Sequence, residues 1–195
     1  MKTIGSTIIM LALASSLFAD NGKELKLASP DGTHEIVFYQ KQVSPAVNEL
    51  CYRVDYKSQP VVNESRAGLE LDNRIWEMAL GVRNLKQPAC WMDNLEVDSV
   101  TYQPETNLTW QPLYGERSSV RDHYRAGTLC LSKKDNSGYR LNIEVRAYNE
   151  GVAFRYFFPE HPKAIFHKVV GDLTEYALPA GTKAWTCLLY TSPSP

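Results

Sequence analysis

The feature that most constrains the fold of this chain is a strict alternation of apolar and polar residues on both sides of a short turn. Every second residue of the stretch 139–148 is apolar and points to one side: Leu141, Ile143, Val145 and Ala147. The residues between them are polar: Arg140, Asn142, Glu144 and Arg146. Asn149-Glu150-Gly151 supplies a turn, and a second apolar and aromatic stretch, 152–158, ends at Pro159. This pattern predicts an antiparallel hairpin with one buried face.

Shorter stretches elsewhere repeat the two-residue period. Strands are predicted at 35–39 (after the turn sequence Ser29-Pro30-Asp31-Gly32), at 50–56, at 59–62 after a polar turn, and at 68–71. In the second of these, one face carries Leu50, Tyr52, Val54 and Tyr56. A further strand pair is predicted at 164–170 and 175–178. The stretch 74–85 has weak helical spacing without caps, so we expect a loop there. The chain is therefore expected to be all-β, an antiparallel β-sandwich.

Composition narrows the class of protein. The 195 residues have room for one domain, and 44% of them are hydrophobic, as in a folded globular chain rather than a disordered one. Lys and Arg number 21 against 22 Asp and Glu, which leaves a net charge of −1. A charge balance this even gives no basic surface for nucleic acid or for an anionic membrane.

The first 19 residues read as a secretory signal peptide. Lys2 precedes an apolar run from Ile4 to Leu17, and the small residue Ala19 stands at the expected cleavage position. The run is shorter than the ~20 apolar residues of a spanning helix. We therefore expect a mature chain that begins at Asp20, is secreted or periplasmic, and has no membrane span.

The last nine residues, 187–195, do not continue the preceding pattern. Their order, Cys-Leu-Leu-Tyr-Thr-Ser-Pro-Ser-Pro, is the translation of a DNA sequence that resembles a transposon-based library adapter. We interpret this tail as non-native and exclude it from the fold. The native domain is then expected to cover residues 20–186 and to be cut short at its C-terminal end.

Without Cys187, three cysteines remain: Cys51, Cys90 and Cys130. Cys51 and Cys130 lie within alternating strand patterns, so we expect both to be buried free thiols. The cysteine and histidine spacings do not match a zinc site.

The densest group of polar and aromatic residues is the stretch 110–124. Its candidate binding residues are Trp110, Glu116, Arg121, His123 and Tyr124. Aromatic faces with planar polar groups suit a sugar, which stacks on a ring and accepts paired hydrogen bonds. Structural roles are also open here, because Arg121 could pair with Glu116 to brace a loop, and Trp110 and Tyr124 could anchor the core.

His123 beside a carboxylate could also serve as a general acid and base, as sugar epimerisation would need. A single histidine in a loop more commonly serves as a hydrogen-bonding group, so this interpretation is not favoured. The sequence lacks a nucleophile elbow, a zinc-protease motif and a phosphate loop.

Four groups of residues follow one another in a fixed order. They are Ser29-Pro30-Asp31-Gly32, Gly68-Leu69-Glu70-Leu71, the block from Trp110 through Tyr114-Gly115-Glu116 to Arg121-Asp122-His123-Tyr124, and Asn149-Glu150-Gly151-Val152-Ala153-Phe154-Arg155-Tyr156 before Pro159. In combination they resemble the N-terminal domain of glycoside hydrolase family 97, secreted enzymes of the α-glucosidase and α-galactosidase type that are typical of Bacteroidota. The resemblance covers nearly all of residues 25–185. Tyr114 departs from it, since a tryptophan is expected there.

The resemblance implies a β-super-sandwich like that of galactose mutarotase, followed in full-length members by a catalytic (β/α)₈ barrel and a small β domain. It also implies that two barrel carboxyl groups hydrolyse the glycoside and that calcium binds near them. A barrel needs ~250 residues, which this chain does not contain. We therefore assign no catalytic or metal-binding residue here, expect no cofactor in this chain, and expect the chain alone to be inactive.

The predicted function is that of a carbohydrate-binding or scaffold domain in a secreted glycosidase that acts on α-linked glucose or galactose in oligosaccharides. Its partners would be the catalytic barrel, on which it packs, and through that barrel the oligosaccharide. One alternative is a free-standing carbohydrate-binding β-sandwich module, and another is a structural or adhesive sandwich. The loop 110–124 is the natural candidate for a wall of the active-site pocket.

Overall fold

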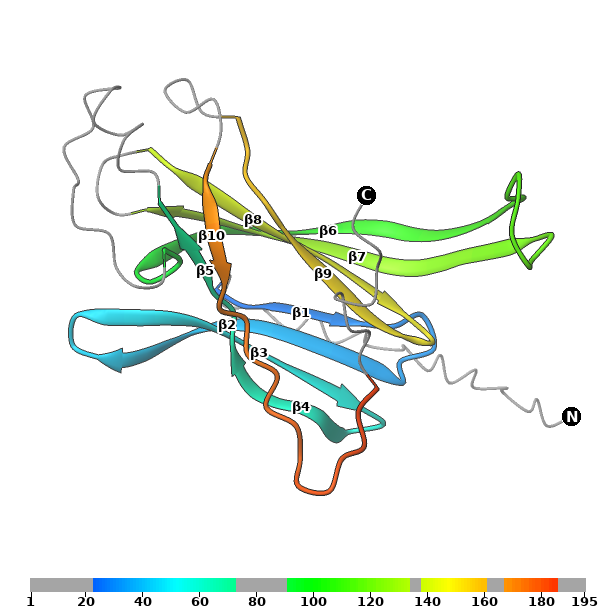
Figure 1. Ribbon diagram of the computed structural model, residues 1–195, viewed down its shortest axis with the longest axis horizontal. Helices are drawn as coiled ribbons and strands as arrows, with labels where there is room; N and C mark the ends of the chain where they lie inside the picture. Colours follow the sequence, from blue (N-terminus) through cyan, green and yellow to red (C-terminus); the bar gives the residue numbers. More distant parts are fainter. Residues whose placement is uncertain (1–22, 73–90, 134–137, 161–166, 186–195) are drawn as a thin grey trace, which may run out of the picture.

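The computed structural model describes residues 23–72, 91–133, 138–160 and 167–185 (Figure 1). All regular structure in these parts of the chain is β-strand, as the sequence predicts. The strands are β1 (Leu25–Ala28), β2 (His34–Ser44), β3 (Val47–Tyr56), β4 (Gln59–Arg66), β5 (Leu69–Leu71), β6 (Leu95–Trp110), β7 (Val120–Lys133), β8 (Arg140–Tyr148), β9 (Gly151–Phe157) and β10 (Val169–Asp172).

Two four-stranded antiparallel sheets form the layers of a sandwich. One sheet has the order β1-β2-β3-β4 and the other the order β6-β7-β8-β9, while β5 and β10 form a separate antiparallel pair. Strand β1 lies against β7 and β8 of the opposite sheet, and β2 lies against β8 and β9 (Figure 1). The all-β sandwich predicted from the sequence is confirmed.

The predicted hairpin at 139–158 forms as β8 and β9. All four apolar residues of its first strand are fully buried: Leu141, Ile143, Val145 and Ala147. Tyr148 pairs with Gly151, so the connection is the two residues Asn149 and Glu150. Burial of one face of β8 against β1 and β2 explains why the alternation in this stretch is so strict.

The turn before β2 is held by the carboxylate of Asp31. Its Oδ1 accepts hydrogen bonds from the hydroxyl of Ser29 (2.6 Å), the amide of Thr33 (3.0 Å) and the hydroxyl of Thr33 (2.9 Å). Gly32 follows with a φ of 74°, a conformation that suits glycine. These hydrogen bonds stabilise the ionised carboxylate and lower the pKa of Asp31 to about 2. The bond from Ser29 makes the largest contribution.

The predicted strand at 50–56 is the second half of β3. Leu50, Tyr52 and Val54 are buried on one face, while Tyr56, at the end of the strand, is partly exposed. Lys57 and Ser58 connect β3 to β4 with φ values of 48° and 63°. Positive φ at both central residues is the signature of a tight hairpin turn, so the polar turn predicted here is confirmed.

The strand pair predicted at 164–170 and 175–178 is wrong. Strand β10 pairs with β5, and 175–178 is not a strand. Instead this segment runs along β4, where the amide of Asn63 donates to the carbonyl of Ala177 (2.8 Å) and the amide of Glu175 donates to the carbonyl of Arg66 (2.8 Å). Isolated backbone bonds of this kind impose no period on the side chains.

The cysteine predictions hold in part. Cys51 is a buried free thiol, and Cys130 is free but only partly buried. Burial is the main cause that raises the pKa of the Cys51 thiol to about 11. Cys90, the predicted loop at 74–85, the signal peptide 1–19 and the tail 187–195 lie outside the described residues. The described ranges contain no helix that is long and apolar enough to cross a membrane.

Candidate functional site

The stretch singled out from the sequence lies on an arm that leaves the body of the sandwich. Strand β8 pairs with β7 only from Tyr124 to Ser132. Beyond Tyr124, strands β6 and β7 continue as a two-stranded ribbon that ends in the loop 111–119 (Figure 1). We call residues 103–124 the arm. Beyond Tyr124 the arm pairs with no third strand among the described residues, and most side chains of β6 in this part are exposed, so the arm is open to contact with another structure.

The strand register sorts the five candidate residues onto different sides of the arm. Trp110 is paired with Val120, and Tyr124 with Thr106, so Trp110 and Tyr124 lie on one face. Thr109 is paired with Arg121 and Asn107 with His123, which places Arg121 and His123 on the opposite face. Glu116 lies in the loop at the tip. The five residues therefore do not converge on one pocket.

The face with Arg121 and His123 is a polar network. Nε2 of His123 lies 2.7 Å from Oε1 of Glu105, and Nε of Arg125 donates to Oε2 of the same carboxylate at 3.0 Å. These two hydrogen bonds lower the pKa of the Glu105 carboxyl, and the one from His123 makes the largest contribution. Nε of Arg121 donates to Oδ1 of Asn107 at 3.0 Å. The network links β6 to β7 and stiffens the arm.

Arg121 does not pair with Glu116, the bracing role that the sequence left open; its partner among the described residues is Asn107. Cross-strand pairing explains this outcome. Asn107 and Arg121 are diagonal neighbours on one face of the ribbon, whereas Glu116 lies in the loop beyond the last pair.

The other face of the arm presents aromatic and apolar side chains. Trp110 is 52% exposed, and Leu113 and Tyr114 at the tip are 99% and 90% exposed. A role for Trp110 as a core anchor is therefore excluded. Tyr124 is partly buried at the base of the arm, 5.1 Å from the ring of Tyr148, and the guanidinium of Arg146 lies 4.5 Å from its ring centre. Tyr124 anchors the arm to β8, while Trp110 and the tip are free to contact a partner.

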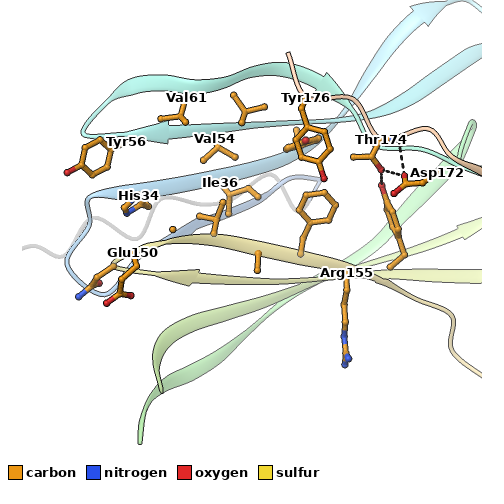
Figure 2. Close-up of a pocket in the computed structure, with 18 residues that line it drawn as sticks. His34, Ile36, Val54, Tyr56, Val61, Glu150, Arg155, Asp172, Thr174 and Tyr176 are labelled. Carbon is orange, nitrogen blue, oxygen red and sulfur yellow. Dashed lines mark hydrogen bonds between the residues drawn. The ribbon is translucent and has the colours of Figure 1, made fainter. Parts of the chain in front are cut away.

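A second candidate site was not foreseen from the sequence. A groove of about 1050 Å³ lies between the inner faces of β2, β3 and β4 on one side and β9 on the other (Figure 2). Its lining includes Ile36, Val54, Val61, Phe154 and Tyr176. Alternation marks most of these residues as inward-facing, but the sequence gives no sign that the two sheets leave space between them.

Most polar groups of the groove wall are already paired. The hydroxyl of Tyr156 lies 2.5 Å from Oγ1 of Thr174, which in turn donates to Asp172 at 2.6 Å. The hydroxyl of Tyr52 donates to the carbonyl of Glu175 at 2.7 Å. Burial is the main cause that raises the pKa of Tyr156 and of Tyr52. The groove wall is thus more apolar than polar, and most of its polar groups are bonded within the chain.

The described residues do not form a metal site. Within 23–72, 91–133, 138–160 and 167–185, no three side chains of His, Cys, Asp or Glu come together as ligands of a metal ion would. These residues therefore do not fit the calcium site that the resemblance implies for full-length members, and no step proposed below uses calcium.

Comparison with known proteins decides the family. A family profile described as "Glycosyl-hydrolase 97 N-terminal" matches residues 27–193. This chain belongs to that family. The matched range includes part of the segment 187–195, whose non-native origin stays a prediction.

Individual relatives agree with this assignment. The chain is 26% identical, over 178 residues and 91% of its length, to a protein named retaining alpha-galactosidase from Bacteroides thetaiotaomicron. Solved structures of a glycoside hydrolase family 97 enzyme from Pseudoalteromonas sp. strain K8, one in complex with panose and another with acarbose, superpose on 80% of this chain with a TM-score of 0.64 and 25% identity. A beta-arabinopyranosidase shares the fold, with a TM-score of 0.63 over 80% of this chain and 17% identity.

The chain spans only about a fifth of these relatives. It covers 22% of the alpha-galactosidase and 20% of the Pseudoalteromonas enzyme. The family 97 N-terminal domain is thus joined in those proteins to a much longer polypeptide.

Proposed function

We propose that this chain is the scaffold part of a secreted glycoside hydrolase that acts on α-linked glucose or galactose in oligosaccharides. Its arm packs on the catalytic part of the full-length protein and borders the oligosaccharide there. The single observation that carries this proposal is the arm itself, a ribbon braced by its own polar network whose exposed residues are Trp110, Leu113 and Tyr114. Exposed aromatic side chains on a rigid element are typical of interfaces.

The relatives support the substrate class. One bears the name alpha-galactosidase, and structures of another hold panose or acarbose. In this proposal the groups that break the glycosidic bond belong to the rest of the protein, since hydrolysis needs a pair of carboxyl groups flanking the bond. This chain holds the arm against the catalytic part and shapes one border of the oligosaccharide site. Trp110 and the tip pack on the partner surface, and Glu105 holds Arg125 and His123 so that the arm keeps its geometry.

The test is substitution in the full-length enzyme. We expect Trp110→Ala and Arg121→Ala each to lower kcat/KM on an α-linked oligosaccharide by about fivefold or more, because a loosened arm no longer positions its contacts. Val43→Ala is the matched control. Val43 is 49% exposed, and it lies in the hairpin of β2 and β3 at the end of the molecule opposite the arm (Figure 1). Unchanged kcat/KM together with an unchanged melting temperature in both arm variants would reject the proposal.

A titration separates this function from a free-standing binding module. We expect the 195-residue chain alone to bind panose with no saturable affinity, because the exposed aromatic residues of the arm lie on an open ribbon, and most polar groups of the groove wall are already bonded within the chain. Saturable binding that is lost in Trp110→Ala would favour the binding module instead.

A further inference from the structure

Strand β6 contains a β-bulge at the base of the arm. The register of β6 with β7 shifts between Gln103 and Thr106. Within this interval, Pro104 and Glu105 lie opposite the single residue Arg125. Proline suits such a position because it has no amide hydrogen to donate to a neighbouring strand. A bulge bends its strand and increases the local twist, so this one sets the direction in which the arm leaves the sandwich.

The bulge also decides which face of the arm carries Trp110. On the body side of the bulge, Tyr102 is paired with Gly127 on the inner face, where its hydroxyl accepts a hydrogen bond from the amide of Lys26 at 3.3 Å. With regular pairing, every even-numbered residue that follows in β6 would stay on this inner face. Because the bulge adds one residue, Trp110 lies instead on the outer face with Tyr124.

Two charged residues hold the bulge on the inner face, and we call Glu105 and Arg125 the clamp. The two carboxylate oxygens of Glu105 are bonded separately, one to His123 at 2.7 Å and the other to Nε of Arg125 at 3.0 Å. Arg125 also reaches the opposite sheet, since its Nη2 donates to the carbonyl of Pro30 at 3.4 Å. Pro30 lies in the turn before β2 that Asp31 holds. The clamp thus joins the bulge both to β7 and to the opposite sheet.

The energetics assign the clamp to the direction of the arm rather than to the stability of the sandwich. A ribbon of two strands is only marginally stable by itself, so contacts at its base decide how it is oriented. Tyr124 holds the outer side of the base against Tyr148, and the clamp holds the inner side. The side chains of Arg125 and Glu105 are 43% and 40% exposed. Ion pairs with this exposure contribute little to global stability.

We propose that Glu105 and Arg125 are positioning residues of the hydrolase, which lock the bulge and so direct Trp110 and the tip of the arm towards the oligosaccharide. Neither residue touches the oligosaccharide itself. The inference rests on the proposed function, in which the arm borders the oligosaccharide. A loosened clamp weakens substrate binding without altering the groups that break the glycosidic bond. It therefore raises KM and leaves kcat nearly unchanged.

Distance measurements by electron paramagnetic resonance on the 195-residue chain test the clamp. Spin labels on non-natural amino acids at Leu113, in the tip, and at Glu150, in the turn between β8 and β9, leave the cysteines unmodified; both positions are exposed. We expect a distribution of distances about twice as wide, or wider, in Glu105→Ala as in the parent chain. Glu144→Ala is the matched control, because it removes a similar pair with Arg155 where the register is regular. Equal widths in the two variants would overturn the proposal.

Kinetics of the full-length protein keep the test valid if the short chain fails to fold. With panose as substrate, we expect Glu105→Ala and Arg125→Lys each to raise KM about threefold or more, with kcat within about twofold of the parent and an unchanged melting temperature. Lysine keeps the charge but lacks the fork that bonds Glu105 and Pro30 together. A lower kcat and a lower melting temperature with unchanged KM would show a structural role alone and overturn the proposal.

The variants of the arm separate this inference from the proposed function. A loss of kcat/KM in Trp110→Ala without a rise of KM in the clamp variants would reject the clamp and retain the scaffold role. Unchanged kcat/KM and melting temperature in both Trp110→Ala and Arg121→Ala would reject the proposed function, and with it the positioning role, whatever the distance distributions show.

Discussion

The rings of Phe38 in β2 and Phe154 in β9 meet edge to face, with centroids 5.2 Å apart and planes inclined by 78°. Tyr52 in β3 lies 5.3 Å from Phe38 and 5.2 Å from Phe154, so that three aromatic rings join the two sheets. Phe154 is only partly covered, because its other side borders the groove. This cluster connects the packing of the two sheets to the groove.

The contribution of Phe154 can be measured directly. We expect Phe154→Ala to lower the free energy of unfolding by about 2–4 kcal/mol, somewhat less than a fully buried phenylalanine would, because part of the ring is already exposed. Phe157→Ala in the same strand is the control, since Phe157 is on the outer face, and we expect it to cost less than about 1 kcal/mol. Urea unfolding followed by fluorescence measures both values. Equal losses for the two variants would contradict the role given to the aromatic cluster.

The turn carboxylate of Asp31 makes stability depend on pH in a narrow acidic range. Its pKa in the folded chain is about 2, below the ordinary value of 3.8, so ionised Asp31 stabilises the fold fully above pH 4. This stabilisation is lost as the pH falls from about 4 towards 2. We expect Asp31→Asn to melt at a lower temperature than the parent chain at pH 7, and the difference to shrink towards pH 2. A difference that stays constant between pH 7 and pH 2 would show that the charge has no role.

The exposed tip of the arm is expected to limit solubility without contributing to stability. Leu113 and Tyr114 are almost fully exposed, so replacing both with lysine removes no packing. We expect the double variant Leu113→Lys, Tyr114→Lys to change the free energy of unfolding by no more than about 0.5 kcal/mol while raising the soluble yield of the chain. Melting temperature and soluble fraction after expression measure the two effects. A clear loss of stability would mean that the tip packs against the body.

Short-range sequence patterns predicted the strands and turns whose conformation depends on neighbouring residues in the chain. The hairpin of β8 and β9 follows from the alternation in 139–148, and the turn at Asp31 follows from the hydrogen-bonding capacity of a short carboxylate beside glycine. The segment 175–178 is not a strand because its bonds to β4 are isolated and mix backbone with side-chain groups: the amide of Ala177 donates to the hydroxyl of Ser65, and the amide of Arg66 donates to the carboxylate of Glu175.

The candidate site was less accessible to prediction. Thr106, Leu108 and Trp110 alternate like residues of a buried strand, but they share a face with Tyr124, opposite in parity to the buried Leu129 and Leu131 of β7. The sequence of β6 does not reveal which of its faces the second sheet covers. The groove depends on where two separate sheets end relative to each other. No local pattern encodes such an offset, so Val61 and Tyr176 could not be identified as neighbours of β9.

The central claim is that this chain supports a hydrolase without containing its chemistry. The most direct measurement is an assay of the purified 195-residue chain with aryl α-glucoside and aryl α-galactoside, alongside a full-length family 97 enzyme. We predict no release of the aryl alcohol above the buffer blank from the short chain and clear turnover by the full-length enzyme. Turnover by the short chain that follows its concentration and survives repurification would contradict the account.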